Sequence, residues 1–282
     1  MTHIRNSTIL ITGGASGIGQ LMGQMSLERQ ARCLIIWDIN PAQLQSAASR
    51  LTEKGYQVFP FEVDVADAVQ IQKASEQIIR EIGVPDIIIN NAGIVVGKTF
   101  ADHSYADIGR TINVNVLGVM YVTRAFLPGM LTRGTGHIVN IASAAGLLPN
   151  PRMSVYASSK WAVLGWSESL RLELEEHYPE LHVTTVTPSY IDTGMFAGVK
   201  APLLTPIIKP QAMAAAILNA VEKNKILLRK PAIVYLLPVL RGILPTRLFD
   251  LVVGRLFNVY SSMNHFAGRP TAEALTSHKP KA

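Results

Sequence analysis

The chain has 282 residues, of which 48% are hydrophobic and 16% charged. This composition is typical of a globular protein and excludes the disordered class. A single cysteine excludes an internal disulfide and a zinc site built from cysteines, while the net charge of +6 raises the question of an acidic partner.

The N-terminal residues run almost directly into a β-like segment and show no apolar signal region. We therefore expect no secretory or transit peptide and a cytoplasmic protein. No segment reaches the roughly 18 uncharged apolar residues that a membrane-spanning helix needs.

Short apolar runs alternate with amphipathic stretches as far as about residue 225. We expect strands at 8–11, 33–37, 57–62, 87–90, 137–141, 182–187 and 226–228. We expect helices at 17–30, 41–54, 67–82, 107–133, 154–178 and 210–224. Apolar strands separated by helices predict an α/β fold: a doubly wound, Rossmann-type parallel sheet of about seven strands with helices on both faces. No linker is evident, so we expect one domain.

The first predicted strand leads into a glycine-rich segment, Thr12-Gly13-Gly14-Ala15-Ser16-Gly17-Ile18-Gly19. Glycines permit a tight turn and let the backbone approach a pyrophosphate without a Cβ in the way. The following helix N-terminus offers N–H groups and a positive dipole end to the phosphates. A glycine cluster alone also fits an ordinary turn, but a strand before it and a helix after it favour a dinucleotide site.

Asp38 ends the second predicted strand, nineteen residues after Gly19. A carboxylate there can accept hydrogen bonds from ribose hydroxyls and would repel a 2′-phosphate. Because the glycine loop contains no Arg or Lys, NAD is favoured over NADP. Asp38 also fits a turn or cap before Pro41, and the two roles are compatible.

Tyr156 and Lys160 are four residues apart in a predicted helix, so both side chains lie on one face. A neighbouring ammonium favours the phenolate and lowers the tyrosine pKa from about 10 towards neutrality. That change would suit the phenol to proton exchange. The same spacing also occurs by chance in helices, so it does not decide the chemistry alone.

Further motifs follow in order, and together they resemble the short-chain dehydrogenase/reductase family over nearly the whole chain. The matching segments are the glycine loop, Asn90-Asn91-Ala92-Gly93, Asn115 within Val114–Gly118, and Ser143 thirteen residues before Tyr156. Asp64, in Val63-Asp64-Val65, matches the family residue that holds the adenine.

This resemblance implies four catalytic residues. Ser143 would orient the substrate oxygen, Tyr156 would exchange the proton, Lys160 would bind the nicotinamide ribose, and Asn115 would hold a water in the proton relay. It also implies a cofactor site made of Gly13, Ser16, Gly17, Ile18, Gly19, Asp38, Asp64, Val65, Asn91, Ala92, Gly93, Tyr156, Lys160, Pro188, Ile191 and Thr193. Ser189 replaces the family's glycine after Pro188, which leaves the local turn open. The histidines show no metal-ligand spacing, and we assign no metal.

We divide the chain into an NAD-binding catalytic part, residues 1–228, and a C-terminal extension, 229–282, packed on the same domain. A lid at 189–209 would cover the substrate. Ser143, Tyr156, Met195 and Phe196 are the expected substrate contacts. The apolar lid favours a lipophilic substrate, although any lid must bury apolar side chains.

The C-terminal extension is basic as well as apolar. Residues 198–282 hold 12 Lys and Arg against 3 Asp and Glu, and prolines at 231, 238 and 245 should break residues 226–260 into short helices. Such helices suit peripheral contact with a lipid surface better than nucleic acid. A cap over the substrate pocket or an oligomer contact fits equally well.

The extension resembles the branch of the family that holds retinol dehydrogenases and lipid-droplet 17β-hydroxysteroid dehydrogenases. That branch usually carries an N-terminal hydrophobic anchor, which this sequence does not show, so we expect peripheral attachment at most. By resemblance, the helices near 107–133 and 154–178 would pair copies into a homodimer or homotetramer.

The expected function is hydride transfer between NAD(H) and the CH–OH or C=O group of a lipophilic alcohol or ketone that is retinoid-, steroid- or long-chain-like. Two alternatives stay open. One is a ketoreductase of acyl-carrier-bound substrates, drawn by the basic surface, and the other is a non-catalytic module that senses a dinucleotide.

Overall fold

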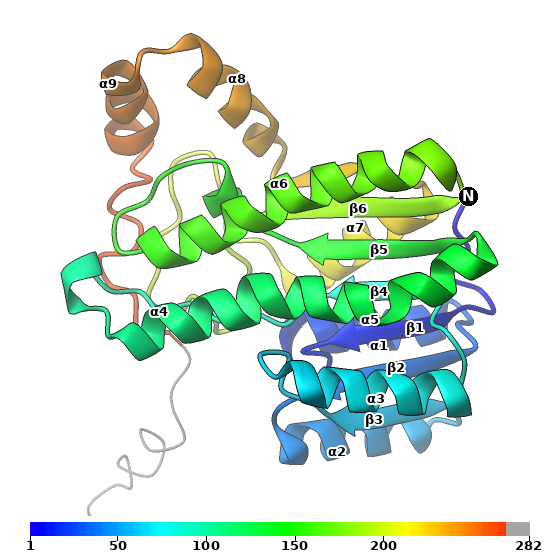
Figure 1. The fold of residues 1–282 in the computed structure, drawn as a ribbon. Helices are drawn as coiled ribbons and strands as arrows, with labels where there is room; N and C mark the ends of the chain where they lie inside the picture. The colour runs from blue at the N-terminus through cyan, green and yellow to red at the C-terminus, as the bar shows by residue number, and fades with distance from the viewer. Residues whose placement is uncertain (269–282) are drawn as a thin grey trace, which may run out of the picture.

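The seven predicted strands form a single parallel sheet in the computed structural model, which describes residues 1–268 (Figure 1). They are β1 (Thr8–Thr12), β2 (Cys33–Asp38), β3 (Val58–Glu62), β4 (Ile87–Asn90), β5 (Gly136–Ile141), β6 (Leu181–Pro188) and β7 (Leu227–Lys230). Their order is β3-β2-β1-β4-β5-β6-β7. Successive strands are therefore added on one side of β1 as far as β3, and on its other side from β4 onwards. A ligand in a doubly wound sheet binds at such a switch point, beyond the carboxyl ends of the strands.

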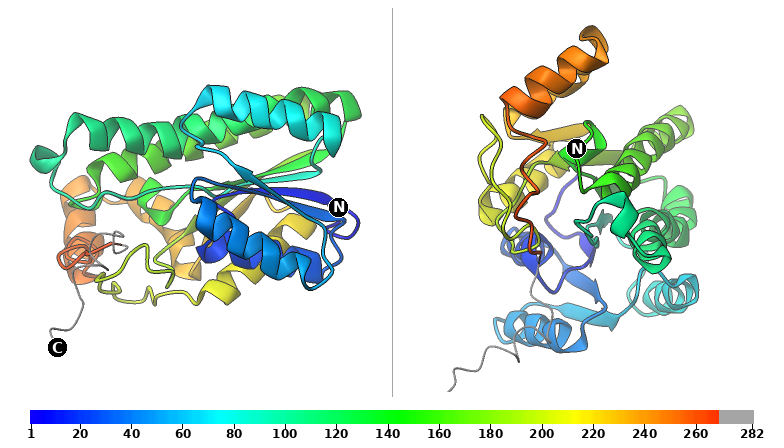
Figure 2. Two further views of the ribbon diagram at one scale, coloured as in Figure 1. Left: turned by 90° about the horizontal axis from the view of Figure 1, so that it is seen from below. Right: turned by 90° about the vertical axis from the view of Figure 1, so that its left-hand side faces the viewer.

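Helices cover both faces of the sheet, as the doubly wound fold requires (Figures 1 and 2). One layer holds α1 (Gly17–Glu28), α2 (Pro41–Thr52) and α7 (Pro210–Glu222). The other holds α3 (Ala68–Glu81), α4 (Tyr105–Ile112), α5 (Gly118–Arg133) and α6 (Ser154–His177). The central strands are therefore buried on both sides, which explains why they are apolar throughout rather than alternating.

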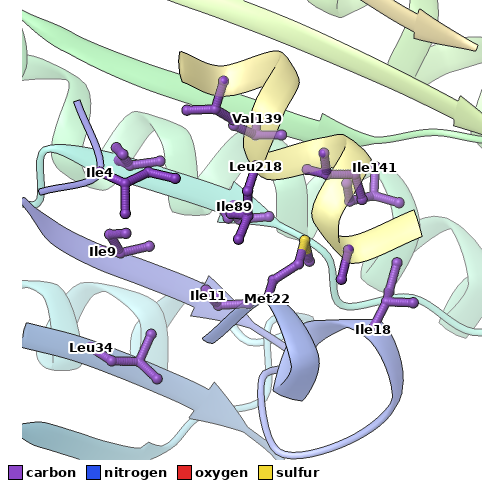
Figure 3. Close-up of a cluster of buried hydrophobic side chains, with 14 of the residues drawn as sticks. Ile4, Ile9, Ile11, Ile18, Met22, Leu34, Ile89, Val139, Ile141 and Leu218 are labelled. Carbon is purple, nitrogen blue, oxygen red and sulfur yellow. The ribbon is translucent and has the colours of Figure 1, made fainter. Parts of the chain in front are cut away.

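Figure 3 shows the core between the sheet and the layer of α1 and α7. Ile11 and Ile89, from neighbouring strands, lie against Met22 of α1 and Leu218 of α7, and all four side chains are fully or almost fully buried. This packing holds α1 directly behind the end of β1, which fixes the position of its N-terminus.

The helix predicted at 107–133 begins earlier, at Tyr105, because Ser104 and Asp107 form a capping box. Ser104 Oγ accepts from the Asp107 N–H at 3.0 Å, and Asp107 Oδ2 accepts from the Ser104 N–H at 3.1 Å. A π-helical turn at Asn113–Leu117 then joins α4 to α5.

Taken as one helix, Tyr105–Arg133 is long and apolar enough to span a bilayer by length and composition, contrary to our expectation. Half of the residues in its most apolar 18-residue stretch are buried, and the helix packs against α3, as a core helix does.

The C-terminal extension begins with a 3₁₀ turn (Ala232–Leu236), followed by α8 (Leu237–Ile243), α9 (Thr246–Phe249) and a π-helical turn (Asp250–Leu256). Pro231 and Pro245 precede helical turns, as predicted. Pro238 does not break a helix, because it lies in the first turn of α8, where no backbone N–H is needed. Residues 257–268 return alongside the predicted lid, and residues 269–282 lie outside the described part of the chain.

Candidate active site

The glycine loop adopts conformations that other residues would resist. Gly13 has φ +62° and Gly17 has φ +56°. A Cβ at Gly19 would lie only 2.3 Å from the Gly13 carbonyl oxygen, so the first turn of α1 packs closely on the loop. The loop thus presents bare backbone and the N-terminus of α1 at the switch point.

The loop is tied to the segment that follows β4. The Asn91 side-chain amide donates to the carbonyls of Thr12 and Gly13, at 2.9 and 3.1 Å. The Thr12 hydroxyl accepts from the backbone N–H groups of Asn91 and Ala92, both at 3.0 Å. These bonds hold β1 and β4 together where their connections diverge.

A cavity extends across the carboxyl ends of the strands from β2 to β6 and encloses about 1340 Å³, its open mouth included. Every residue predicted for the cofactor, the substrate and catalysis lines it, except Gly19 and Asn115. Two carboxylates, Asp38 and Asp64, lie in its wall with two cations, Arg110 and Lys160. A glycine-lined helix N-terminus, carboxylates and a lysine in one cavity fit a dinucleotide.

Asp38 has one of the two roles that its position suggested, that of a turn residue before Pro41. It lines the cavity at the end of β2, and its carboxylate accepts from the Ala15 N–H and from the Asn40 N–H, both at 3.1 Å. The helix cap is Asn40, whose side chain accepts from Gln43 N–H. Asp64 accepts from the Ala66 N–H at 2.9 Å.

The catalytic candidates converge at the other end of this cavity. Tyr156 and Lys160 lie one turn apart on α6, each 5% exposed, and Ser143 follows β5. Lys160 Nζ lies 5.8 Å from the centre of the Tyr156 ring and donates to the Ile141 carbonyl at 2.8 Å. The ammonium has two further N–H groups to offer to a ligand.

Burial governs the protonation of this pair. Burial raises the pKa of Tyr156 to about 12, although a hydrogen bond from Ser143 lowers it; Tyr190 raises it further. Burial also lowers the pKa of Lys160 to about 8. Burial thus moves the tyrosine pKa in the direction opposite to the one that the helical spacing predicts. The phenol carries its proton at neutral pH.

Asn115 occupies the π-helical turn between α4 and α5, and its side chain is fully engaged. Its Oδ1 accepts from the Ile94 N–H at 2.9 Å, while its Nδ2 donates to the Ile94 carbonyl at 2.9 Å and to Ser159 Oγ at 3.1 Å. The amide thus positions the segment after β4 against α6.

The lid begins where β6 ends. Ser189, which replaces the family's glycine, does not adopt a left-handed backbone conformation, so a serine is accommodated. Ile191 forms an isolated parallel β-bridge with Ile208. Thr193, Met195 and Phe196 line the cavity that also contains the glycine loop, called here the dinucleotide cavity. The Phe196 ring packs edge-on against Tyr156, with centroids 6.0 Å apart.

A second cavity opens beside the first and encloses about 830 Å³, its mouth included. The two cavities share Ser143, Ser189 and Phe196. The rest of the second wall is almost entirely apolar and comes from the loop after β5, the lid and the C-terminal extension. Its apolar side chains include Leu148, Met153, Leu203, Leu204, Val234, Leu237, Leu240, Val253, Phe257 and Val259. The extension therefore covers the second cavity, as a cap over a pocket would.

Several lining residues escaped the sequence prediction. Ile39, Val63 and Ala142 immediately follow strands and Ile94 lies four residues after β4, so strand ends in a parallel sheet would have indicated them. Arg110 gave no such signal, since its position depends on how α4 packs across the site.

Among residues 1–268 no cluster of three or more His, Cys, Asp or Glu could hold a metal ion. Trp161 is 41% exposed and lies under the Arg241 guanidinium at 4.3 Å. It therefore contacts the C-terminal extension.

A family model of the short chain dehydrogenases matches residues 7–203. The chain belongs to the short-chain dehydrogenase family. Mouse epidermal retinol dehydrogenase 2 is 32% identical over 95% of this chain and 87% of its own length. Human short-chain dehydrogenase/reductase 3 is also 32% identical, over 95% and 89%, and estradiol 17-beta-dehydrogenase 11 of Macaca fascicularis is 31% identical, over 91% and 85%. The relatives place the chain in the branch of retinol and 17β-hydroxysteroid dehydrogenases.

Solved structures share the fold. A short chain dehydrogenase/reductase from Burkholderia phymatum in complex with NAD has a TM-score of 0.79 at 24% identity, covering 90% of this chain and 97% of that one. A metagenomic short-chain oxidoreductase in complex with NADP has a TM-score of 0.68 at 24% identity, over 81% and 98%. Family membership makes this short-chain dehydrogenase an oxidoreductase that uses a nicotinamide dinucleotide.

Proposed function

We propose that this short-chain dehydrogenase interconverts a lipophilic alcohol and its carbonyl compound with NAD(H). The observation that carries the proposal is the apolar cavity that meets the dinucleotide cavity at Ser143 and Phe196. A retinoid-, steroid- or long-chain-like molecule would bury its body there with its reacting carbon beside Ser143 and Tyr156.

A bound nicotinamide dinucleotide supplies the hydride donor or acceptor. Ser143 Oγ accepts from the Ala145 N–H at 3.1 Å, and its hydroxyl can orient a substrate oxygen. Tyr156 carries the proton that a newly reduced carbonyl oxygen requires, and in the oxidation its phenolate form would accept the proton of the alcohol. Lys160 would offer its remaining N–H groups to the nicotinamide ribose. The Asn115 side-chain amide holds the segment after β4 in position.

We assign NAD rather than NADP on the charge at the β2 end of the cavity. Asp38 and Asp64 present carboxylates there, and a 2′-phosphate beside Asp38 would be repelled. Gly13, Ser16, Gly17 and Ile18 would hold the pyrophosphate, with Gly19 allowing the helix to approach. Asn91, Ala92, Gly93, Pro188, Ile191 and Thr193 would line the nicotinamide half.

The test is turnover of alcohols and ketones of graded chain length with NAD(H) and NADP(H), in the wild type and in Tyr156→Phe. We expect long apolar substrates to be preferred and the substitution to lower kcat by about 10² to 10⁴-fold, because the proton donor is lost. The dissociation constant for NADH, measured by fluorescence, should stay within about threefold.

Tyr121→Phe, on the surface of α5, is the matched control and should leave kcat unchanged. Normal rates in Tyr156→Phe would refute the assigned proton donor. Equal kcat/KM for short hydrophilic and long apolar alcohols would refute the lipophilic substrate class.

We also propose that the protein acts in the cytoplasm and attaches peripherally to lipid through the extension at residues 226–260. Val239, Ile243, Leu251 and Leu256 are each more than half exposed there, among the arginines at 241, 247 and 255.

The lining of the apolar cavity also includes exposed side chains next to the extension. Leu203 and Leu204, which are 57% and 61% exposed, lie at the mouth of the apolar cavity, and the Leu203 N–H donates to Phe257 O at 2.9 Å. An oily substrate could thus pass from the lipid surface into the cavity.

A further inference from the structure

The end of the C-terminal extension supplies part of the apolar packing around Tyr156. Tyr156 belongs to a cluster of buried side chains that includes Met263, which is 1% exposed, and Phe266 packs against the same cluster. Met263 and Phe266 lie outside residues 7–203, the part of the chain that the family model matches. The packing around the proposed proton donor is therefore completed by a segment that the family motifs do not contain.

The Phe266 ring contacts two segments that border the dinucleotide cavity. On the lid, its centroid lies 6.4 Å from that of Phe196, whose ring packs edge-on against Tyr156 at 6.0 Å. On the segment after β4, a Cβ built on Gly97 would lie only 2.2 Å from Phe266 Cδ1, so the ring lies directly on the Gly97 backbone. Phe266 thus joins the lid to the segment after β4, one aromatic ring away from Tyr156.

Hydrogen bonds hold the backbone on both sides of Phe266. The Ala267 N–H donates to the Ala197 carbonyl of the lid at 2.9 Å. The Arg152 guanidinium, from the loop after β5, donates to Asn264 Oδ1 at 2.6 Å. The position of the ring therefore follows from contacts with two other parts of the fold.

Apolar packing disfavours the charged form of Tyr156. The side chain is 5% exposed, and burial raises its pKa to about 12, because a phenolate loses its hydration among apolar groups. The titratable groups that face it are Lys160 on α6 and Tyr190 on the lid. His265, the neighbour of Phe266, is exposed to solvent. Water exclusion by rings such as Phe266 therefore opposes the phenolate.

We propose that Phe266 is a positioning residue for the reaction: its ring, in contact with the lid and with the Gly97 backbone, keeps water away from the Tyr156 hydroxyl. Oxidation of an alcohol needs the phenolate as the proton acceptor, whereas reduction of a carbonyl needs the phenol as the donor. Phe266 would therefore shift oxidation to higher pH and leave reduction active at neutral pH. This inference rests on the proposed function, which assigns the proton exchange to Tyr156.

The experiment measures the pH profile of kcat for oxidation of a long-chain alkan-1-ol with NAD, in the wild type and in Phe266→Ala. The smaller side chain admits water, so the pKa of Tyr156 should fall towards its ordinary value of about 10. We expect the profile to move to lower pH by about one unit and kcat at about pH 8 to rise by about threefold or more. Structural damage would instead lower kcat at every pH. Phe266→Leu keeps an apolar side chain and should keep the wild-type profile.

Gly97→Ala is an independent variant, because its Cβ would displace the Phe266 ring without changing it, and the Gly97 backbone is not left-handed. It should shift the profile in the same direction as Phe266→Ala. Gly109→Ala on α4 is the matched control, since no atom lies within 4 Å of its Cβ position. His265→Ala removes the neighbouring titratable group, and it should also keep the wild-type profile.

An ultraviolet titration of the phenol, with the titration of Tyr156→Phe subtracted, reports on Tyr156 without any turnover. Tyr156 should lose its proton below about pH 11 in Phe266→Ala but not in the wild type. Coincident titrations of the wild type and Phe266→Ala would overturn the proposal, as would an equal shift in His265→Ala. A shifted titration in Phe266→Ala without turnover of any alcohol would refute the proposed reaction and leave the role of Phe266 standing.

Discussion

Packing around single residues of the site changes their protonation and their hydrogen bonding. Tyr156 and Lys160 lie on one helix face, as their spacing requires, yet the lysine donates to Ile141 instead of the phenol. The pKa of each is moved by burial, a property of the packed site that four residues of sequence do not contain. Packing also determines the partners of Asn115, whose side-chain amide hydrogen-bonds to the backbone N–H and carbonyl of Ile94.

Asp38 should set the choice of dinucleotide. In Asp38→Asn the shape is kept but the charge is removed, so repulsion of a 2′-phosphate disappears and Arg110 in the same cavity can attract it. We expect NADPH to bind about tenfold more tightly than to the wild type and NADH somewhat less tightly, measured by fluorescence titration.

Asp64→Asn makes the same charge change elsewhere in the cavity and should alter the ratio of the two affinities less. Equal affinity of the wild-type protein for NADH and NADPH would contradict the role given to Asp38.

At the scale of elements, the lid is held by the end of the C-terminal extension. The Lys200 N–H donates to Ser262 O at 3.1 Å, and the Ala267 N–H donates to Ala197 O at 2.9 Å. Between these bonds Gly198 allows close contact, since a Cβ there would lie only 1.9 Å from the His265 carbonyl oxygen. Two segments some sixty residues apart thus form one wall of the apolar cavity.

Gly198→Ala should separate the extension from the lid. We expect KM for a long apolar substrate to rise about tenfold or more, because the cavity wall opens, while the dissociation constant for NADH stays the same. Steady-state kinetics and limited proteolysis of the lid would show both effects.

Gly194→Ala is a matched control, since Gly194 has φ +79° against +83° for Gly198 but no atom within 4 Å of its Cβ position. Gly194→Ala therefore introduces the same kind of backbone strain as Gly198→Ala, but its Cβ does not collide with a neighbouring atom. An equal rise in KM in both variants would attribute the effect to strain in the lid rather than to contact with the extension.

At the scale of the whole molecule, the basic charge and the exposed apolar residues lie together at the end of the fold where the substrate cavity opens. The extension that carries α8 and α9 projects beyond the sheet on that side (Figure 1). This combination of arginines and apolar side chains suits a surface of anionic lipid. Assembly into a homodimer or homotetramer through α5 and α6 stays a prediction.

Liposome flotation would measure this attachment. We expect the wild-type protein to float with anionic vesicles and less with neutral ones, and the double variant Ile243→Glu, Leu251→Glu to lose most of the bound fraction. Val69→Glu changes an equally exposed apolar residue on α3 and should float like the wild type. Flotation of the double variant at the wild-type level would exclude the extension as the lipid contact.

The sequence by itself determined the sheet, the glycine loop and the family, and it predicted the catalytic set. These features are local: a buried strand needs a short apolar run, a close backbone approach needs glycine, and the motifs keep fixed spacings. Only the tertiary structure decided how the C-terminal extension is used and which cavity Arg110 faces. Those properties depend on contacts between segments far apart in the chain, and neither composition nor periodicity carries information about such contacts.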